Sequence, residues 1–279
     1  MRKEVAVGID VGGTKIEGVL IDKHGKVLKK RRVQSNVEEG PDAVLARIGR
    51  LVRRLTTRKE AKVGISFPGF LDEGVLHNAP NMDGLEGKPL PQLLRRHVRR
   101  PLIVENDANC FAVAEHRLGA GKGFRNVAGL IIGTGIGSGL VLDGELYKGA
   151  HGGAGEVNNI RYGEEDVESY AAGPGILKRF YKHGGSPERA ERVFQDRSPA
   201  AEKTVEETVE AVAWLCHTLW ATLDVDRIIL GGGVSNAPIV KRANDKLAEH
   251  GVETCKVVRH KVSDSAGSIG AALLAFERA

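Results

Sequence analysis

The chain has 279 residues, which is about the length of two domains. Hydrophobic residues make up 41% and charged residues 28%, and this composition excludes disordered and collagen-like proteins. The 41 basic and 36 acidic residues give a net charge of +5. Because the basic clusters lack interleaved aromatic residues, we expect solvated helix faces and no nucleic-acid partner, while a mildly basic surface would also suit an anionic small substrate.

The cysteines and the N-terminal residues indicate a compartment. Cys110, Cys216 and Cys255 are scattered and form no C-x-x-C pair, so neither a disulfide framework nor a cysteine-based zinc site is expected. Nothing at the N-terminus resembles a signal peptide. The longest uncharged run, residues 126–142, is shorter than a spanning helix and contains five glycines. We therefore expect a cytoplasmic protein without a membrane partner.

The first half of the chain alternates strand-like and helix-like segments, which is typical of α/β proteins. Strands are predicted at residues 5–9, 15–21, 25–33, 62–66 and 102–105. A helix is predicted at residues 41–55, because its apolar residues recur at helical spacing. A second helix is predicted at residues 108–118, where Asn106 and Asp107 can cap the start and Gly119 the end.

The second half repeats this alternation. Strands are predicted at residues 127–132, 139–142, 227–230 and 256–258. Helices are predicted at residues 204–223, 238–250 and 265–277, the first of them from apolar residues spaced three and four apart. The chain thus reads as two consecutive α/β halves.

An internal similarity connects these halves. Gly12 and residues 18–22 match Gly133 and residues 139–143 at a constant offset, so each half opens with a strand, a glycine-rich turn and a second strand. We predict two related domains that face each other across a ligand-binding cleft. The first would span residues 1–107 and be completed by a C-terminal helix at 265–279, and the second would span 108–264.

Three glycine clusters are candidates for nucleotide binding. A turn without Cβ atoms lets backbone N–H groups approach phosphate oxygens, and Asp10 could hold Mg²⁺ or its bound water. The third cluster follows a strand and precedes a helix, which suits a flat adenine or ribose. No P-loop or G-x-G-x-x-G fingerprint is present. The candidate residues are Asp10, Gly12, Gly13, Thr14, Lys15, Gly133, Thr134, Gly135, Gly231, Gly232 and Gly233.

The combined motifs resemble the ROK family of repressors, open reading frames and sugar kinases. Five motifs occur in the family's order over nearly the whole chain: residues 8–15, 105–109, 133–139, 152–156 and 230–234. The resemblance implies the two-domain actin/hexokinase fold, which is ribonuclease H-like and has a cleft between its domains. It also implies ATP and Mg²⁺ as cosubstrates and phosphorylation of a hexose, usually at its terminal hydroxyl.

The resemblance assigns roles to single residues. Asp107 matches the family's catalytic base, and a carboxylate at a helix N-terminus is held ionised, so that it can accept the proton of the attacking hydroxyl. Asn81 and Asn106 match positions that hydrogen-bond sugar hydroxyls. Glu156 and Glu168 match two carboxylates that bind the same hydroxyls.

The chain departs from the family between these two glutamates. Most members carry a Gly-His pair and then a zinc-binding C-x-C-G-x-x-G-C-x-E, whereas this chain has Asn158-Asn159 and no cysteine in residues 160–167. Asn159 stands where the family's histidine would bridge zinc and sugar, so one substrate contact is changed in kind. We expect no structural zinc. Packing would hold the shortened loop, with Tyr162 and Tyr170 as anchors.

We therefore predict an ATP-dependent, glucokinase-like hexose kinase that acts on the 6-hydroxyl, closes its domains against water and forms a homodimer. An N-acetylmannosamine or N-acetylglucosamine kinase is the nearest alternative. A sugar-responsive repressor would need a winged-helix domain before the first motif, and only a few residues precede residue 5. A catalytically inactive sugar-binding protein is disfavoured by the intact Asp107 and phosphate turns.

Overall fold

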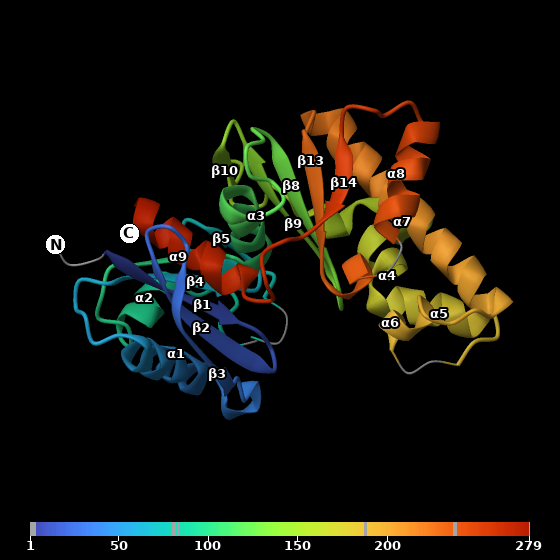
Figure 1. Cartoon of the computed structure of the whole chain (residues 1–279). Helices are drawn as coiled ribbons and strands as arrows, with labels where there is room; N and C mark the ends of the chain where they lie inside the picture. Colours follow the sequence, from blue (N-terminus) through green and yellow to red (C-terminus); the bar gives the residue numbers. More distant parts are fainter. Residues whose placement is uncertain (1–3, 80–81, 83, 187–188, 237–238, 279) are drawn as a thin grey trace. The chain divides into compact units, whose positions relative to one another are not determined.

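The computed structural model describes residues 4–79, 82, 84–186, 189–236 and 239–278. The chain divides into two compact units, each containing one five-stranded mixed sheet (Figure 1). Unit 1 comprises the described residues of Met1–Leu118, Lys148–Ala154 and Val262–Ala279. Unit 2 comprises those of Gly119–Tyr147 and Gly155–Lys261. The α/β class predicted from the alternating segments is confirmed.

The sheet of unit 1 has the strand order β3-β2-β1-β4-β7. The first three of these strands pair antiparallel, whereas β1, β4 and β7 run parallel. Parallel strands need a crossover connection, and the intervening chain supplies it. The strands are β1 (Val5–Val11), β2 (Lys15–Asp22), β3 (Val27–Gln34), β4 (Lys62–Phe67) and β7 (Leu102–Asn106).

Helix α9 (Ala266–Arg278) packs unusually close to this sheet. Gly8 of β1 and Gly64 of β4 are register partners, and a Cβ at either would lie less than 2 Å from a carbonyl oxygen of α9. On the other side of α9, a Cβ at Gly270 would lie 1.8 Å from the Cys110 carbonyl oxygen in α3 (Asp107–Leu118). Glycine at these positions lets the sheet, α9 and α3 approach backbone to backbone.

Helix α1 (Pro41–Leu55) covers part of unit 1's sheet with its apolar face. Its bounds are the predicted ones. Leu51 and Leu55 lie over Gly18 of β2, whose missing side chain makes room for them. The core of this unit gathers these helix residues and the apolar residues of β1 and β4. Burial of such a face stabilises the helix more than its intrinsic propensity does.

Unit 2 repeats the strand plan of unit 1. Its sheet has the order β10-β9-β8-β13-β14, with an antiparallel set of three strands followed by parallel pairings of β8, β13 and β14. The hairpins β1–β2 and β8–β9 occupy equivalent places, which is the structural basis of the internal similarity in the sequence. The strands are β8 (Val127–Ile132), β9 (Ile136–Leu142), β10 (Glu145–Tyr147), β13 (Arg227–Gly231) and β14 (Lys256–Arg259).

Helices of unit 2 are partly predictable. The long helix α7 (Pro199–Leu223) begins five residues before the predicted start at 204, because Ser198 accepts a hydrogen bond from the Ala201 N–H and Pro199 suits the first turn. The helix α8 (Ile239–Glu249) falls within the predicted 238–250, and residue 238 lies outside the described residues. Short helices absent from the prediction are α4 (Val167–Ala171), α5 (Gly173–Lys182) and α6 (Ala190–Val193).

Several predicted boundaries are corrected. The third strand begins at Val27 instead of residue 25, because Gly25 adopts a φ of 81° in a turn closed by its hydrogen bond to the Asp22 carbonyl. The strand predicted at 139–142 begins at Ile136, since pairing with β8 extends it through a glycine-rich stretch without an apolar signal. The helix predicted to begin at 108 begins at Asp107.

One of the basic clusters, formed by Lys29, Lys30, Arg31 and Arg32, lies on β3, so the expectation of a solvated helix face is wrong for this cluster. β3 is an edge strand, and charged side chains there discourage pairing with another sheet. Small elements complete unit 1, namely η1 (Val37–Glu39), β5 (Phe70–Asp72), β6 (Val75–His77) and α2 (Leu90–Arg95). Among the described helices, none is both long and apolar enough to cross a bilayer.

The compact units divide the chain differently from the predicted domains. Helix α3 belongs to unit 1, where it packs against α9, so the boundary falls after Leu118 instead of after residue 107. The segment Lys148–Ala154 also belongs to unit 1, because Gly152 lies against the Leu71 carbonyl of β5. The described residues of the C-terminal segment Val262–Ala279, which include α9, are part of unit 1.

Candidate functional site

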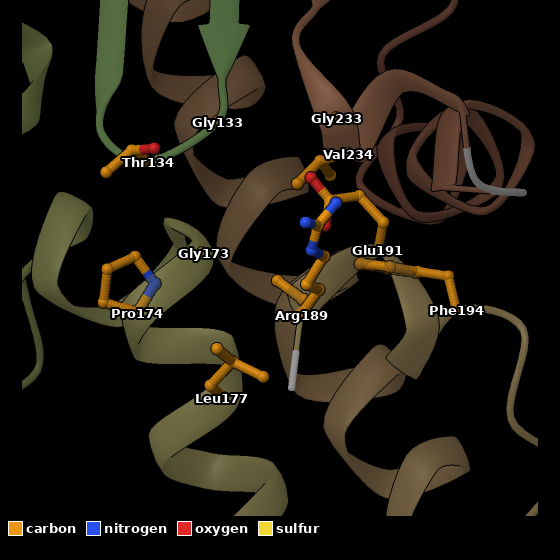
Figure 2. Close-up of a pocket in the computed structure, with 11 residues that line it drawn as sticks. Gly133, Thr134, Gly173, Pro174, Leu177, Arg189, Glu191, Phe194, Gly233 and Val234 are labelled. Carbon is orange, nitrogen blue, oxygen red and sulfur yellow. The ribbon is translucent and has the colours of Figure 1, made fainter. Parts of the chain in front are cut away.

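A cavity of about 440 Å³ lies in unit 2, within the size range of small-ligand pockets. Two of the three glycine clusters contribute to it, through Gly133 and Gly233. Figure 2 shows Thr134, Pro174 and Leu177 on one side of the cavity and Glu191, Phe194 and Val234 on the other. The wall is mostly apolar, with the polar groups of Thr134, Arg189 and Glu191 at a few positions. This composition suits a flat, partly polar ligand such as a nucleoside.

The Gly133–Gly135 turn joins β8 to β9 at the edge of this cavity. The Gly133 N–H donates to the Gly135 carbonyl at 2.9 Å, so it closes the turn and is not a donor for a ligand. Within the described part of the chain, no group accepts a hydrogen bond from the N–H of Thr134 or Gly135. These two N–H groups are therefore the candidate phosphate donors of the second turn.

Gly133 itself has room for a side chain. A Cβ at this position would meet nothing within 4 Å, and its φ lies outside the left-handed region. Glycine is thus not demanded by the fold there. By contrast, a Cβ at Gly232 would lie 2.2 Å from the Ile132 carbonyl oxygen, and Gly232 has a φ of 82°. Gly232 therefore serves the close approach of β13 to β8, while Gly233 lines the cavity.

The first turn lies in unit 1, between β1 and β2. The Gly12 N–H donates to the Lys15 carbonyl at 2.9 Å, which closes the turn. Ser35 braces it, because its hydroxyl donates to the Gly12 carbonyl at 2.5 Å and its N–H donates to the Thr14 carbonyl at 3.0 Å. Thr14 and Lys15 are exposed at the tip, as is Gly13. The tip is therefore accessible to a ligand.

Asp10 lies directly before this turn, on the face of the sheet that α9 covers. Its Oδ1 accepts a hydrogen bond from the Ser66 hydroxyl at 2.6 Å, and its carboxylate lies against Gly267 in the first turn of α9. Burial raises the pKa of Asp10, while the Ser66 hydrogen bond opposes that rise. A nearby cation would favour the ionised form.

The first turn of α3 carries the predicted base. Asp107 is exposed as the first residue of α3, and its Oδ1 accepts the Ala108 N–H at 2.8 Å. Asn106 is buried and acts as the helix cap, because its Oδ1 accepts the Asn109 N–H at 3.0 Å and its Nδ2 donates to the Gly69 carbonyl. Glu105 accepts hydrogen bonds from the Asn106 N–H and the Asn109 amide. This network fixes the point from which the Asp107 side chain projects.

The predicted sugar carboxylates both lie in unit 2. Glu156 precedes the short helix η2 (Val157–Asn159) and follows Gly155, which has a φ of 94° and lies against the Ser138 carbonyl. Asn159 is exposed and donates to Asn158 at 3.3 Å. Glu168 is half-buried in α4, and its Oε2 accepts the Ile136 N–H at 2.6 Å. Glu168 is thus hydrogen-bonded to the residue directly after the Gly133–Gly135 turn.

A model of the ROK family matches residues 6–278. The chain belongs to the ROK family. It is 30% identical to a glucokinase of Thermotoga maritima over 100% of this chain and 99% of that protein. It is 31% identical to an N-acetyl-D-glucosamine kinase of Histophilus somni over 97% of this chain and 99% of that protein.

A solved structure gives the same assignment of fold. The ROK family glucokinase of Streptomyces griseus, determined in complex with glucose and AMPPNP, aligns with a TM-score of 0.83 at 25% identity. The alignment covers 98% of this chain and 99% of that one. The ROK chain described here therefore has the actin-like sugar kinase fold predicted from the resemblance.

The structure distributes the predicted residues of this ROK protein over both units. Asp10, the Gly12 turn, Asn106 and Asp107 lie in unit 1, whereas the Gly133 turn, the third glycine cluster and the two glutamates lie in unit 2. Asn81 lies outside the described residues. Within unit 2, the structure brings Gly133, Thr134 and Gly233 to one cavity and Glu168 to the adjoining turn.

Several residues that line this cavity were not predicted from the sequence. Pro174 and Leu177 come from α5, and Glu191 and Phe194 come from α6 and its end. Their local sequence has no motif, because an apolar helix residue in a ligand cavity looks like one in a core. Ser66 was also missed, although a polar residue near the end of a buried strand is a usable signal.

Proposed function

We propose that the chain is an ATP-dependent hexose kinase of the glucokinase type, which transfers the γ-phosphate of ATP to the 6-hydroxyl of the sugar. The observation that carries this proposal is the unit 2 cavity. It joins a glycine turn with two available N–H donors to an apolar, nucleoside-sized space, in a chain that belongs to the ROK family.

For the nucleotide, we assign the base to the apolar walls formed by Leu177, Phe194 and Val234. The N–H groups of Thr134 and Gly135 would then receive phosphate oxygens, and the first turn in unit 1 would contact the phosphates through Gly13 and Thr14. Backbone donors that are already oriented stabilise developing charge without reorganisation.

The magnesium ion that kinases use fits the donors present in this chain. Mg²⁺ is commonly held by one or two carboxylates together with substrate phosphates, and Asp10 is a largely buried carboxylate at the foot of the first turn. Among the described residues, no three His, Cys, Asp or Glu side chains converge on a metal-sized site. Asp10 would therefore hold the ion or its water together with ATP. When bound, Mg²⁺ neutralises charge on the phosphates.

For the sugar, we assign hydroxyl contacts to Asn81, Asn106, Glu156, Asn159 and Glu168. Asn106 uses its Oδ1 and one Nδ2 hydrogen within the protein, so its second Nδ2 hydrogen is the donor we assign to the sugar. Ionised glutamates accept strong, directional hydrogen bonds from hydroxyl groups.

Asp107 is assigned as the general base. Its carboxylate is exposed at the N-terminus of a 12-residue helix, which favours the ionised form. It would accept the proton of the sugar hydroxyl as that oxygen attacks the γ-phosphorus and the bond to the β,γ-bridging oxygen breaks. Most of the rate enhancement would come from positioning and charge stabilisation.

An N-acetylhexosamine kinase is the second candidate, because one relative named N-acetyl-D-glucosamine kinase is as similar as the glucokinases. A panel of glucose, N-acetylglucosamine and N-acetylmannosamine in a coupled ADP-release assay separates the two. We expect the highest kcat/KM with glucose. A preference for an N-acetylated sugar would favour the second candidate, and no ATP turnover with any sugar would contradict the kinase proposal.

We also propose that the protein works as a cytoplasmic homodimer without a nucleic-acid partner. Light scattering of the purified protein at micromolar concentration tests the dimer, for which twice the chain mass is expected. A monomer over the whole concentration range of the activity assay would contradict it.

A further inference from the structure

Unit 2 contains a buried cation. Arg179 of α5 is only 8% exposed, and a charged group this deep needs partners for its whole guanidinium. Its Nη2 donates to the Thr208 hydroxyl at 2.6 Å, and its Nε donates to Glu207 at 3.2 Å. Its Nη1 donates to the Tyr170 carbonyl oxygen, and its Cζ lies 4.0 Å from the centre of the Tyr170 ring.

These contacts connect three helices. Tyr170 belongs to α4, Arg179 to α5, and Glu207 and Thr208 to α7. Glu207 is held in turn by His183, whose Nε2 lies 3.0 Å from Oε1. Because a planar guanidinium requires its acceptors in fixed directions, the contacts define how α4 sits on α5 and α7.

Aromatic rings extend this arrangement to the shortened loop. The Tyr162 ring lies 4.9 Å from the Tyr170 ring and 5.1 Å from the Trp214 ring of α7. Tyr162 lies in the small hairpin of β11 (Arg161–Tyr162) and β12 (Glu165–Asp166). We call Tyr162, Tyr170, Arg179, Glu207 and Trp214 the Arg179 cluster. It anchors the loop through the two tyrosines predicted from the sequence.

Helix α4 contributes Tyr170 to this cluster. It has five residues, and a helix that short is not stable by itself. It nevertheless carries Glu168, which accepts the Ile136 N–H. Two residues after α4 ends, the Gly173 N–H donates to the Gly133 carbonyl at 2.8 Å. The stretch from Glu168 to Gly173 therefore holds both ends of the Gly133–Gly135 turn.

We propose that Arg179 is a positioning residue, which acts through Tyr170 to hold Glu168 and Gly173 and thereby keeps the Gly133–Gly135 turn in its nucleotide-binding shape. This inference rests on the proposed function for the identity of the nucleotide. It also gives Glu168 a second role besides the sugar contact: its carboxylate links the sugar-binding helix to the phosphate turn. A displaced α4 would weaken nucleotide and sugar binding together.

Stability alone is a poor reason for this arrangement. Replacing a buried ion pair by well-packed apolar residues is often neutral or stabilising, so an apolar side chain could fill the same space. What the guanidinium adds is direction, because it binds Tyr170, Glu207 and Thr208 at defined angles. The cluster is accordingly expected to affect substrate affinity more than folding.

The test compares R179M and R179K with R242M in steady-state kinetics. Arg242 of α8 pairs with Glu206 of the same helix α7, but its side chain is 38% exposed. We expect R179M to raise the KM for ATP and the KM for sugar by about ten- to a hundredfold, because small displacements of positioned groups have effects of this size. R179K should show nearly the same increase in both KM values as R179M, since lysine lacks the planar guanidinium. R242M should keep the wild-type KM for ATP and KM for sugar.

A purely structural role predicts a different pattern. It would lower the melting temperature and the active fraction, with both KM values unchanged in the folded protein, and that pattern would overturn the proposal. If R179M does not fold, Y170L, which removes the ring beneath the guanidinium, takes its place with the same expectations.

A binding measurement separates this proposal from the proposed function. Calorimetric titration with a non-hydrolysable ATP analogue and Mg²⁺ should give a Kd about tenfold or more weaker in R179M than in the wild type. If the wild type phosphorylates no hexose but this weakening is found, the kinase proposal fails and the positioning role stands. If the wild type is an active hexose kinase and R179M binds the analogue equally well, the positioning role fails.

Discussion

At the scale of single residues, Asp107 and Asp42 are two exposed acidic side chains in the first turn of a helix. They differ in context: Asp107 adjoins a buried network of Glu105, Asn106 and Asn109, whereas Asp42 lies in the first turn of α1. A charge at a helix N-terminus contributes about 0.3–1 kcal/mol to stability in either place. Replacing each aspartate by asparagine therefore distinguishes a catalytic role of Asp107 from a role in stabilising the helix, which both residues share.

We expect D107N to lower kcat by about 10²- to 10⁴-fold, as loss of a general base does, while sugar affinity stays within about fivefold. Asparagine keeps the oxygen that accepts the Ala108 N–H, so the fold should be retained. D42N is the matched control and should keep kcat. A kcat of D107N near that of the wild type, measured in the ADP-release assay, would show that another group accepts the proton.

Substitution of Gly133 tests the nucleotide contact directly. A Cβ at this position would meet no other atom, and residues other than glycine can adopt its backbone conformation. We expect G133V to fold, and to raise the KM for ATP by about tenfold or more, since the valine would fill space beside the phosphate donors. G133A should give a smaller increase, and the KM for sugar should change less in both. An unchanged KM for ATP in folded G133V would rule out the contact.

At the scale of elements, the first turn of α9 lies over two carboxylates of the unit 1 sheet. Glu17 of β2 is paired in register with Asp10 and is 3% exposed. Burial would raise the pKa of Glu17, but hydrogen bonds from Ser265, Arg32 and Lys30 outweigh it and hold that pKa below its usual value. Ser268 of α9 donates to the same carboxylate. These interactions tie α9 to β2 and β3.

The lowered pKa of Glu17 predicts a specific pH dependence of the unfolding free energy. A carboxylate with a lowered pKa contributes stability above its unfolded pKa, and that contribution is lost as pH falls through the folded pKa. E17Q should therefore lose about 1–3 kcal/mol of unfolding free energy at pH 7, and its curve should approach the wild-type curve below pH 4. Urea unfolding across this pH range is the measurement. E39Q, which alters an exposed carboxylate that pairs with Arg47, is the control and should change little.

At the scale of the whole molecule, two sheets of identical strand order carry the candidate site. Each unit places a glycine turn at the end of its first hairpin, and each connects its parallel strands through helices. The differences lie in the additions. Unit 2 alone inserts α4 to α7 between its hairpin and β13, and these helices supply part of the cavity wall and four of the five residues of the Arg179 cluster.

We expect the protein to fold and to work without zinc. Its three cysteines are buried, and burial raises the pKa of Cys255 to about 11, which disfavours the thiolate that zinc requires. Elemental analysis of protein purified without a metal-binding tag should find no stoichiometric zinc. Zinc-selective chelation followed by Mg²⁺ should leave activity intact. Stoichiometric zinc, or activity that only zinc restores, would mean that other ligands replace the missing cysteines.

The sequence by itself determined the α/β class, most of the long elements, the family and the glycine turns. These signals are local: apolar spacing marks a helix such as 41–55, and a glycine between two strands marks a turn wherever the rest of the chain lies. The anchoring of the shortened loop by Tyr162 and Tyr170 also followed from the sequence, because few other large side chains were available there.

Only the tertiary structure decided which residues line the cavity and which groups form hydrogen bonds. Examples are the N–H groups of Gly12 and Gly133, which donate within their own turns, and the hydrogen bond from the Ile136 N–H to Glu168. Leu177 and Phe194 look like ordinary helix residues until α5 and α6 fold beside a turn that precedes them by more than forty positions. Arg179 likewise reads as one more surface cation in a basic chain. Its burial depends on contacts with Tyr170, Glu207 and Thr208, which belong to two other helices. No local sequence pattern predicts such tertiary contacts.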